Sequence, residues 1–368
     1  MTLEKIKREF VRHMETIRAT DPYPKNFMGC LISIIIEPEP ISQEQIVELT
    51  GYSQSTISQT LHKLQYLMPV RTIRKRGDRK HYYFYEGSPE RFVLDLWQKR
   101  VEAQAISFQM IEPMIEHVSD KAGRSIAFKR FSDYLKNLRL YLRLIDEVRN
   151  RGIEEFKQIL ETGLDQKDIV SKKSPEYTAF LEVLRSISYE PTNDKSKAYL
   201  EFKNEFFTSV KTNLNPLFSQ AVANQMIVIH SVFLEGCITQ EQLENSTPLP
   251  RSTISEVLSN SVKVGVIKVS KREGSRIKLY QPAISFADFI LGNYDLVERQ
   301  IDQIFPRLLE FIQRTRKLRP RKKQTKQFLD IISNIKKAYS FTQQFTRRMK
   351  VETVRKLKEE FDRGFVFI

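Results

Sequence analysis

The stretch that decides the fold runs from Ile41 to Tyr83 and reads ISQEQIVELTGYSQSTISQTLHKLQYLMPVRTIRKRGDRKHYY. When the chain is shifted against itself by 197 positions without a gap, this stretch falls on residues 238–280, which read ITQEQLENSTPLPRSTISEVLSNSVKVGVIKVSKREGSRIKLY. Thirteen of the 43 positions are identical, among them Gly77 over Gly274. Chance does not explain a match of this length in one register. We interpret the chain as two repeats of one unit of roughly 170 residues, the size of a whole domain.

The repeat divides the 368 residues into a first domain at 1–170, a linker at 171–197 and a second domain at 198–368. Apolar residues spaced three and four apart predict helices over about 3–19, 26–36 and 124–160, with another from Pro89 to about 117. The second repeat has the same pattern over about 198–214, 285–316 and 324–363, and a short helix is expected within the linker at 176–187. The sequence predicts a mainly α protein whose long flanking helices pack together as an intramolecular pseudo-dimer.

Within the repeated stretch, helix signals define two short helices joined by a tight turn. Ser42 is placed as an N-cap, with Gln45 in the capping-box position, and the helix over about 43–49 closes at Gly51. Ser53 then caps a helix over 54–67. After Pro69 the pattern changes to a β-hairpin with a basic tip. A helix-turn-helix followed by a hairpin is a winged helix, and residues 251–263 and 267–280 repeat its second helix and its wing.

The second helix of a winged helix lies in the DNA major groove, where polar side chains contact base edges and phosphates. We expect these contacts from Gln54, Ser55, Thr56, Ser58 and Gln59 in the first repeat, and from Arg251, Ser252, Thr253 and Ser255 in the second. The alternative is that the repeated Ser-Thr-Ile-Ser run only forms the turn and the helix cap. Both roles are compatible, because Ile57 faces the core while its neighbours do not.

Basic residues surround the glycine at each wing tip. They are Arg74, Lys75, Arg76, Arg79 and Lys80 in the first repeat, and Lys271, Arg272, Arg276 and Lys278 in the second. Glycine suits the backbone conformation of a tight hairpin, and a narrow minor groove attracts the cations beside it. The alternative is a charged hairpin that only discourages edge-to-edge aggregation.

The order of these elements, with the runs SQEQI, LTGYS, STIS and RKRGDRKHYY, resembles the MarR superfamily, especially its GbsR-like branch. The resemblance covers about 28–117 well and 225–316 more loosely. It implies a transcriptional regulator that reads a palindrome as a homodimer through terminal helices, and it leaves room for a small-molecule effector pocket between the helical and winged parts. This chain carries two repeats instead, and residues 245–250 replace residues 48–53 with a different turn, so unequal half-sites are expected.

Composition limits the other classes of protein. The net charge of +15 and the isoelectric point near 9.6 favour a polyanionic partner. The apolar runs are too short for a membrane helix, and the charged N-terminus lacks the pattern of a signal peptide, so we expect a cytoplasmic, nucleoid-associated protein. Cys30 and Cys237 are expected to be buried and inert, and the histidines lack metal-ligand spacing. We expect no metal, no cofactor and no enzyme activity.

The sequence therefore predicts a sequence-specific regulator that binds double-stranded DNA. The alternative is a tandem winged-helix module for protein interaction, or an architectural chromatin protein. The basic wing tips favour DNA, because an interaction module need not keep them in both repeats. The sequence does not identify the operator, the effector or the direction of regulation, and it leaves open whether the pseudo-dimer forms a further homodimer.

Overall fold

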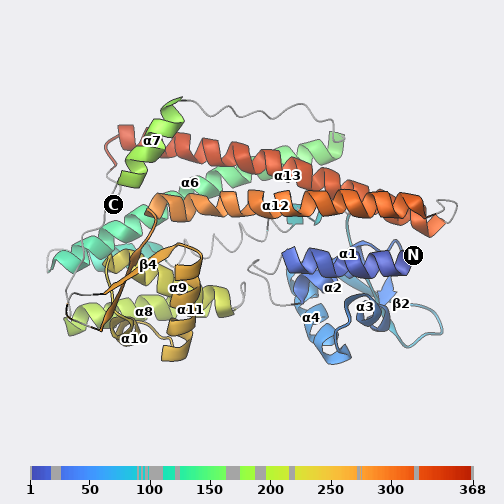
Figure 1. The fold of residues 1–368 in the computed structure, drawn as a ribbon, viewed down its shortest axis with the longest axis horizontal. Helices are drawn as coiled ribbons and strands as arrows, with labels where there is room; N and C mark the ends of the chain where they lie inside the picture. The colour runs from blue at the N-terminus through green and yellow to red at the C-terminus, as the bar shows by residue number, and fades with distance from the viewer. Residues whose placement is uncertain are drawn as a thin grey trace. The chain divides into compact units, whose positions relative to one another are not determined.

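The computed structural model is mainly helical, as predicted (Figure 1). It describes residues 2–17, 26–88, 91–92, 94–95, 98, 111–120, 125–162, 175–186, 196–214, 220–271, 274, 276–318 and 323–365. Across these residues, no helix is long and apolar enough to cross a membrane. The predicted helix from Pro89 to about 117 falls largely outside the described residues. Its described positions 91–92, 94–95, 98 and 111–117 are helical.

The chain forms two compact units, and each unit combines segments from both halves of the sequence. The first unit comprises residues 1–100, 151–170 and 294–348, and the second comprises residues 101–150, 171–293 and 349–368. Three long helices contribute to both units: α6 (Ile126–Thr162), α12 (Phe286–Lys317) and α13 (Lys323–Asp362). The boundaries at 170 and 198 therefore separate the two sequence repeats but not the two compact units. Each compact unit contains helical segments from both repeats.

The first unit begins with α1 (Leu3–Ile17) and α2 (Phe27–Ile35), followed by β1 (Ile41–Ser42), α3 (Gln43–Thr50), α4 (Gln54–Leu67), β2 (Val70–Arg74) and β3 (His81–Tyr85). The second unit contains α7 (Pro175–Ser186), α8 (Lys197–Leu214), α9 (Gln220–Glu235), α10 (Gln240–Ser246), α11 (Arg251–Lys263), β4 (Ile267–Lys271) and β5 (Lys278–Pro282). The helix bounds predicted for α4 and α11 agree with the structure.

The strand registers of the two units differ by the same 197 positions as the sequence repeat. In the first unit, Ile41 pairs with Tyr83, and β2 pairs with β3 from Val70 opposite Tyr85 to Arg74 opposite His81. In the second unit, Ile238 bridges to Tyr280, and β4 pairs with β5 from Ile267 opposite Pro282 to Lys271 opposite Lys278. Tyr83 and Tyr280 are both buried, so a tyrosine at the equivalent repeat position anchors each hairpin in the core of its own unit.

Local capping explains why α3 and α10 start where they do. Ser42 and Gln45 form a capping box at α3, and Thr239 with Gln242 forms one at α10, so two orphan donors are satisfied in each. The two turns that follow differ. Gly51 ends α3 with φ of 79°, a left-handed conformation that favours glycine, whereas α10 ends in extended backbone at Thr247.

The core of the first unit joins α1 to α12 and α13. Phe10 on α1 packs edge-on against Phe311 at 5.3 Å and Phe328 at 6.0 Å between ring centroids. Ile6 and Met14 are fully buried beside Phe10 on the same face of α1. Partners from the far end of the sequence therefore cover the apolar face of this helix.

The second unit has the matching arrangement, with α8 packed on α6. The Phe131 ring lies 5.4 Å from both Phe202 and Phe206. Phe131 precedes Phe328 by 197 positions, so the same repeat position serves both cores. In each unit, the first helix of one sequence repeat packs on the last helix of the other.

A lysine–glutamate pair ties the first helix of each sequence repeat to the end of the helix that follows it. Lys203 Nζ lies 2.6 Å from Glu235 Oε1, which also accepts a 3.0 Å hydrogen bond from the Tyr199 hydroxyl, and all three side chains are buried. In the first unit, Lys7 Nζ lies 2.7 Å from Glu37 Oε1. Pairing is required here because an isolated charge in a core is strongly destabilising.

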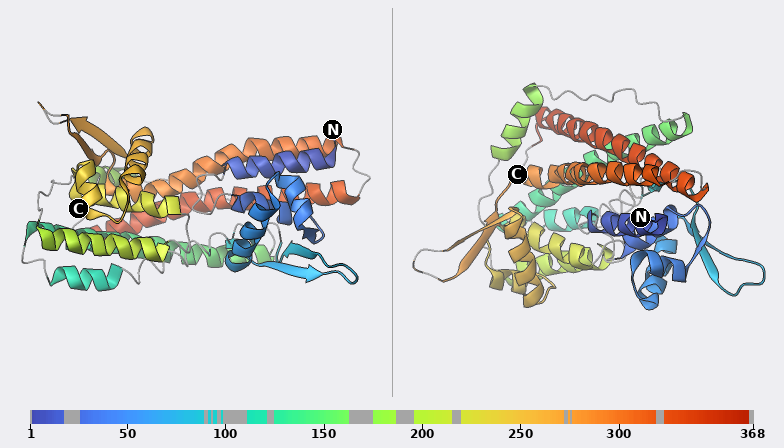
Figure 2. Two further views of the ribbon diagram at one scale, coloured as in Figure 1. Left: turned by 90° about the horizontal axis from the view of Figure 1, so that it is seen from below. Right: turned by 45° about the vertical axis from the view of Figure 1, so that its right-hand side comes forward.

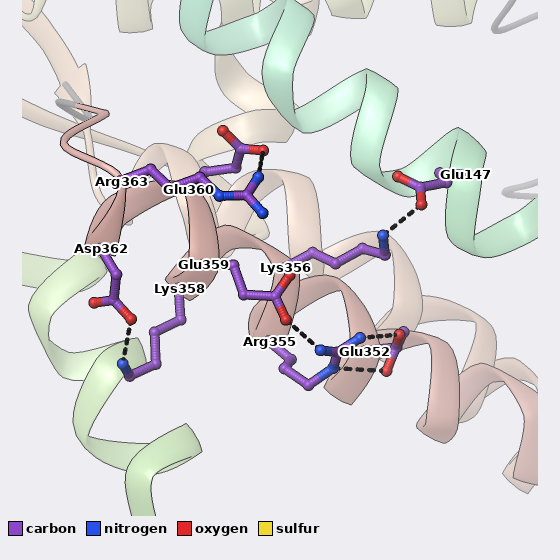
Figure 3. Close-up of polar contacts among 9 residues, drawn as sticks. All are labelled: Glu147, Glu352, Arg355, Lys356, Lys358, Glu359, Glu360, Asp362 and Arg363. Carbon is purple, nitrogen blue, oxygen red and sulfur yellow. Dashed lines mark hydrogen bonds and ion pairs between the residues drawn. The ribbon is translucent and has the colours of Figure 1, made fainter.

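Ion pairs also connect the last turns of α13 to α6 in the second unit. Figure 3 shows Lys356 reaching from α13 to Glu147 on α6. Arg143 on α6 contacts Glu360 at 3.2 Å. Further pairs one turn apart run along α13 (Figure 3). Exposed pairs of this kind contribute at most about 1 kcal/mol each, so they help to set the register of helices that apolar faces hold together.

A glycine permits close contact between α6 and α13 in the first unit. A Cβ at Gly152 would stand 1.4 Å from Cζ of Phe345, which stacks on Phe341. We expect Gly152→Ala to lower the free energy of unfolding by about 1–3 kcal/mol through overpacking, despite the better helix propensity of alanine. The matched control is Gly292→Ala in α12, where nothing lies within 4 Å of the added Cβ. That change should raise stability by about 0.5–1 kcal/mol in chemical denaturation. Stabilisation by both changes would contradict this packing.

Candidate nucleic-acid interface

The leading face of α4 presents polar side chains over an apolar core. Gln54, Ser55, Ser58 and Gln59 are exposed, whereas Ile57 is fully buried. Thr56 is half-buried, and its backbone N–H donates to Ser53 Oγ at 3.2 Å. The same short run therefore caps the helix, anchors it to the core and leaves four side chains available to a ligand.

The exposed face of α4 continues beyond the residues expected from the sequence. His62, Lys63 and Tyr66 follow Gln59 at helical spacing and are exposed, and Tyr66 retains 78% of its surface. The signal was present in the sequence, because spacings of three and four from Gln59 place these side chains on adjoining positions. No acidic residue lies on α4.

The corresponding face of α11 carries charges of both signs, with Lys263 exposed in its last turn. Arg251, Ser252 and Ser255 are exposed and Thr253 is half-buried, as in α4. Arg251 Nε, however, lies 3.5 Å from Glu244 Oε1 on α10. Glu256 is also exposed on this face. A phosphate approaching the start of α11 would therefore meet a cation that is already paired and an exposed carboxylate that makes no ion pair within the described residues.

The tip of the β2–β3 hairpin is held by a turn and an aspartate. The backbone N–H of Asp78 donates to the Lys75 carbonyl at 3.0 Å, and Gly77 takes φ of 81°. Asp78 accepts from the Tyr82 hydroxyl at 2.7 Å and from the Lys80 backbone N–H at 2.9 Å, and these bonds lower the pKa of the Asp78 carboxyl. Figure 2 shows this hairpin projecting from the helices of its own unit.

The cations of this hairpin are not equivalent. Lys75 Nζ lies 4.1 Å from the centroid of the Tyr82 ring, and Arg74 lies 3.1 Å from the His81 imidazole. Lys80 Nζ pairs with Glu44 at 3.3 Å, which links the hairpin to α3. Two others, Arg76 and Arg79, are exposed and make neither an ion pair nor a hydrogen bond with the part of the chain that the structure describes. These two guanidinium groups are therefore the most available to an anion.

The β4–β5 hairpin keeps the glycine and most of the cations. Gly274 takes φ of 71°, and Lys271, Arg276 and Lys278 are exposed. Arg272, also expected to bind DNA, lies outside the described residues. Two apolar side chains are exposed on this hairpin, Val269 at 45% and Ile277 at 56%.

Nothing in the described ranges gathers three or more histidine, cysteine or acidic side chains around a metal position. Cys30 is buried as predicted, and burial raises the pKa of its thiol to about 12, which leaves it protonated and inert. Cys237 is only half-buried. A small, apolar, solvent-connected pocket lies in the first unit, lined by Leu94 and by side chains of α6 and α13. No side chain of α4 or of the hairpin lines it, and the effector pocket stays a prediction.

A scan against protein-family models gives no match, and a search of curated proteins finds no similar sequence.

Proposed function

We propose that the protein is a sequence-specific, double-stranded-DNA-binding transcription regulator related to the GbsR-like branch of the MarR superfamily. Its two tandem winged helix-turn-helix domains arose by internal duplication and act as an intramolecular pseudo-dimer. The observation that carries the proposal is a polar-faced helix followed by a basic hairpin, present twice with strand pairs displaced by one offset of 197 residues.

In the proposed complex, α4 and α11 each enter a major groove, and the hairpins contact phosphates or the minor groove. Gln54 can bond adenine in a bidentate manner, and Arg251 can bond guanine. The free Arg76 and Arg79 support a contact by the first wing, because unpaired cations can replace condensed counterions on DNA without breaking an ion pair.

Selection of bound sequences from a random duplex pool tests this proposal. Because Gln54 and Gln59 are replaced by Arg251 and Glu256 while Ser-Thr-Ile-Ser is kept, the selected site should contain two unlike half-sites. Arg251→Ala should relax preference at one or two base pairs of one half-site, by about 1–3 kcal/mol for each contact. Gln54→Ala should do the same in the other half-site.

The matched control is Arg299→Ala, which removes an exposed positive charge from α12 and should leave every base preference unchanged. Selection of a perfectly palindromic site would contradict the expectation that α4 and α11 prefer different half-site sequences. Uniform weakening on all sequences would mark Arg251 as a phosphate contact. If no sequence is enriched, the protein is not a sequence-specific regulator.

One observation favours the second candidate function, a protein-interaction module, for the second unit. Val264, Val269 and Ile277 are exposed in and beside the β4–β5 hairpin, at 70%, 45% and 56%. In a protein complex, these apolar side chains would be buried. An affinity for a protein partner that Ile277→Lys abolishes, together with no enriched DNA site, would support that function over DNA binding.

A further inference from the structure

One face of α1 carries three basic side chains, and the carboxylate that lies among them, Glu9, pairs with Arg314 of α12. Lys5, Arg8 and Arg12 are exposed and spaced three and four residues apart, which places them along one side of the helix. Their side chains make neither ion pairs nor hydrogen bonds within the described ranges of the chain. The opposite face, with Phe10, is buried in the core. The three cations span about 10 Å of helix axis, which matches about three phosphates of one DNA strand.

Arg12 brings this face to the turn between α3 and α4. A terminal guanidinium nitrogen of Arg12 lies 3.5 Å from the position that a Cβ would take on Gly51. Gly51 precedes Gln54, the first exposed residue of α4, by three positions. Figure 1 shows α1 beside α2 and α3 in this unit. The Arg12 guanidinium therefore lies next to the turn from which the polar face of α4 begins.

The second unit lacks this basic face. Matching the buried faces of the two helices, Ile6, Lys7 and Phe10 with Phe202, Lys203 and Phe206, places Glu201, Asn204 and Thr208 at the positions of Lys5, Arg8 and Arg12. All three are exposed, and none is basic. Lys211 of α8 does reach the corresponding turn, but its ammonium donates a 3.0 Å hydrogen bond to the Pro248 carbonyl. The cation beside the second turn is thus engaged within the protein.

We propose that Lys5, Arg8 and Arg12 form a phosphate-binding ridge on duplex DNA beside the groove that α4 enters, and that the second unit has no such ridge. This inference rests on the proposed function and assigns residues outside the helix-turn-helix and the wing. Charge complementarity supports it, since three free cations on one helix face suit a regular row of phosphates. The first unit then supplies more of the sequence-independent affinity than the second.

The test is the salt dependence of duplex binding by the full chain, measured for Arg8→Ala/Arg12→Ala. Two lost phosphate contacts should reduce the slope of log K against log salt by about 1.8, which is roughly 60-fold in affinity near 0.1 M salt. The loss should be equal on selected and random sequences, because phosphate contacts carry no sequence information. The far-UV circular dichroism and the melting temperature should match those of the unchanged protein, since both side chains are exposed.

The control is Arg299→Ala/Lys337→Ala, which removes the same charge from exposed positions on α12 and α13. If both double variants lose the same slope, net charge alone is responsible and the ridge is overturned. If the ridge variant keeps the original slope, the ridge is overturned while DNA binding stands. If the unchanged protein shows no salt-dependent duplex binding, the proposed function is overturned and the ridge with it.

A gain-of-function variant tests the asymmetry between the units. Asn204→Arg places a cation on α8 where Arg8 stands on α1, at an exposed position. We expect the slope to rise by about 0.9 and the affinity near 0.1 M salt to rise roughly eightfold. An unchanged slope would overturn the assignment of this helix face to the phosphate backbone.

Discussion

Binding to duplex DNA is expected to weaken by about 10³- to 10⁵-fold when the salt concentration rises from 50 to 200 mM. This range follows if six to ten phosphates are contacted, since each contact releases condensed counterions. The net charge of +15 and the free cations at Arg76 and Arg79 motivate the expectation. Fluorescence anisotropy with a labelled duplex at several salt concentrations measures the effect directly.

Within this experiment, Arg79→Ala/Arg276→Ala should reduce the salt slope by about 1.8. Both guanidinium groups are exposed, and neither pairs with another described residue, so their loss should not disturb the hairpins. Arg71→Ala is the control in the same hairpin, because Arg71 already pairs with Glu86 at 2.8 Å and should contribute less. An unchanged affinity for the double variant at moderate salt would exclude the wings from the interface.

Local signals predicted the elements of the repeated stretch. The expected helices at 54–67 and 251–263 agree with α4 and α11, and the capping box of Ser42 and Gln45 is present at α3. These features depend on residues a few positions apart, so the sequence contains the whole interaction. The exposed polar face of α4 was predictable for the same reason, since Ile57 fixes which side of the helix faces the core.

The sequence did not reveal which helix covers which. An apolar face on α1 shows that Phe10 needs a partner, but Phe131 and Phe328 occupy the same repeat position and would suit it equally well. Phe10 contacts Phe328 because of the path that the long helices take through the fold. The spacing of apolar residues in the sequence carries no information about that path. The closeness of Arg12 to Gly51 and of Gly152 to Phe345 escaped prediction for the same reason.

The exchange of helices predicts that neither sequence repeat folds by itself as a stable monomer. A fragment of residues 1–170 lacks α12 and α13 and so exposes Ile6, Phe10 and Met14. Each of these side chains contributes about 1.5–3 kcal/mol when buried, so their exposure alone removes a large part of the 5–15 kcal/mol typical of a domain. A fragment of residues 171–368 likewise lacks the part of α6 that carries Phe131 and covers Phe202.

We expect the two fragments to form a 1:1 complex when they are co-expressed, and this complex should recover cooperative thermal unfolding and duplex binding. The cut falls between α6 and α7, so it interrupts no described helix. Alone, fragment 1–170 should either lack a cooperative transition or self-associate, with α6 of a second copy taking the place of α13. Light scattering coupled to size-exclusion chromatography distinguishes these states. A monomeric fragment 1–170 that melts as cooperatively as the full chain would show that α1 finds sufficient cover within its own repeat, and would contradict the exchanged core.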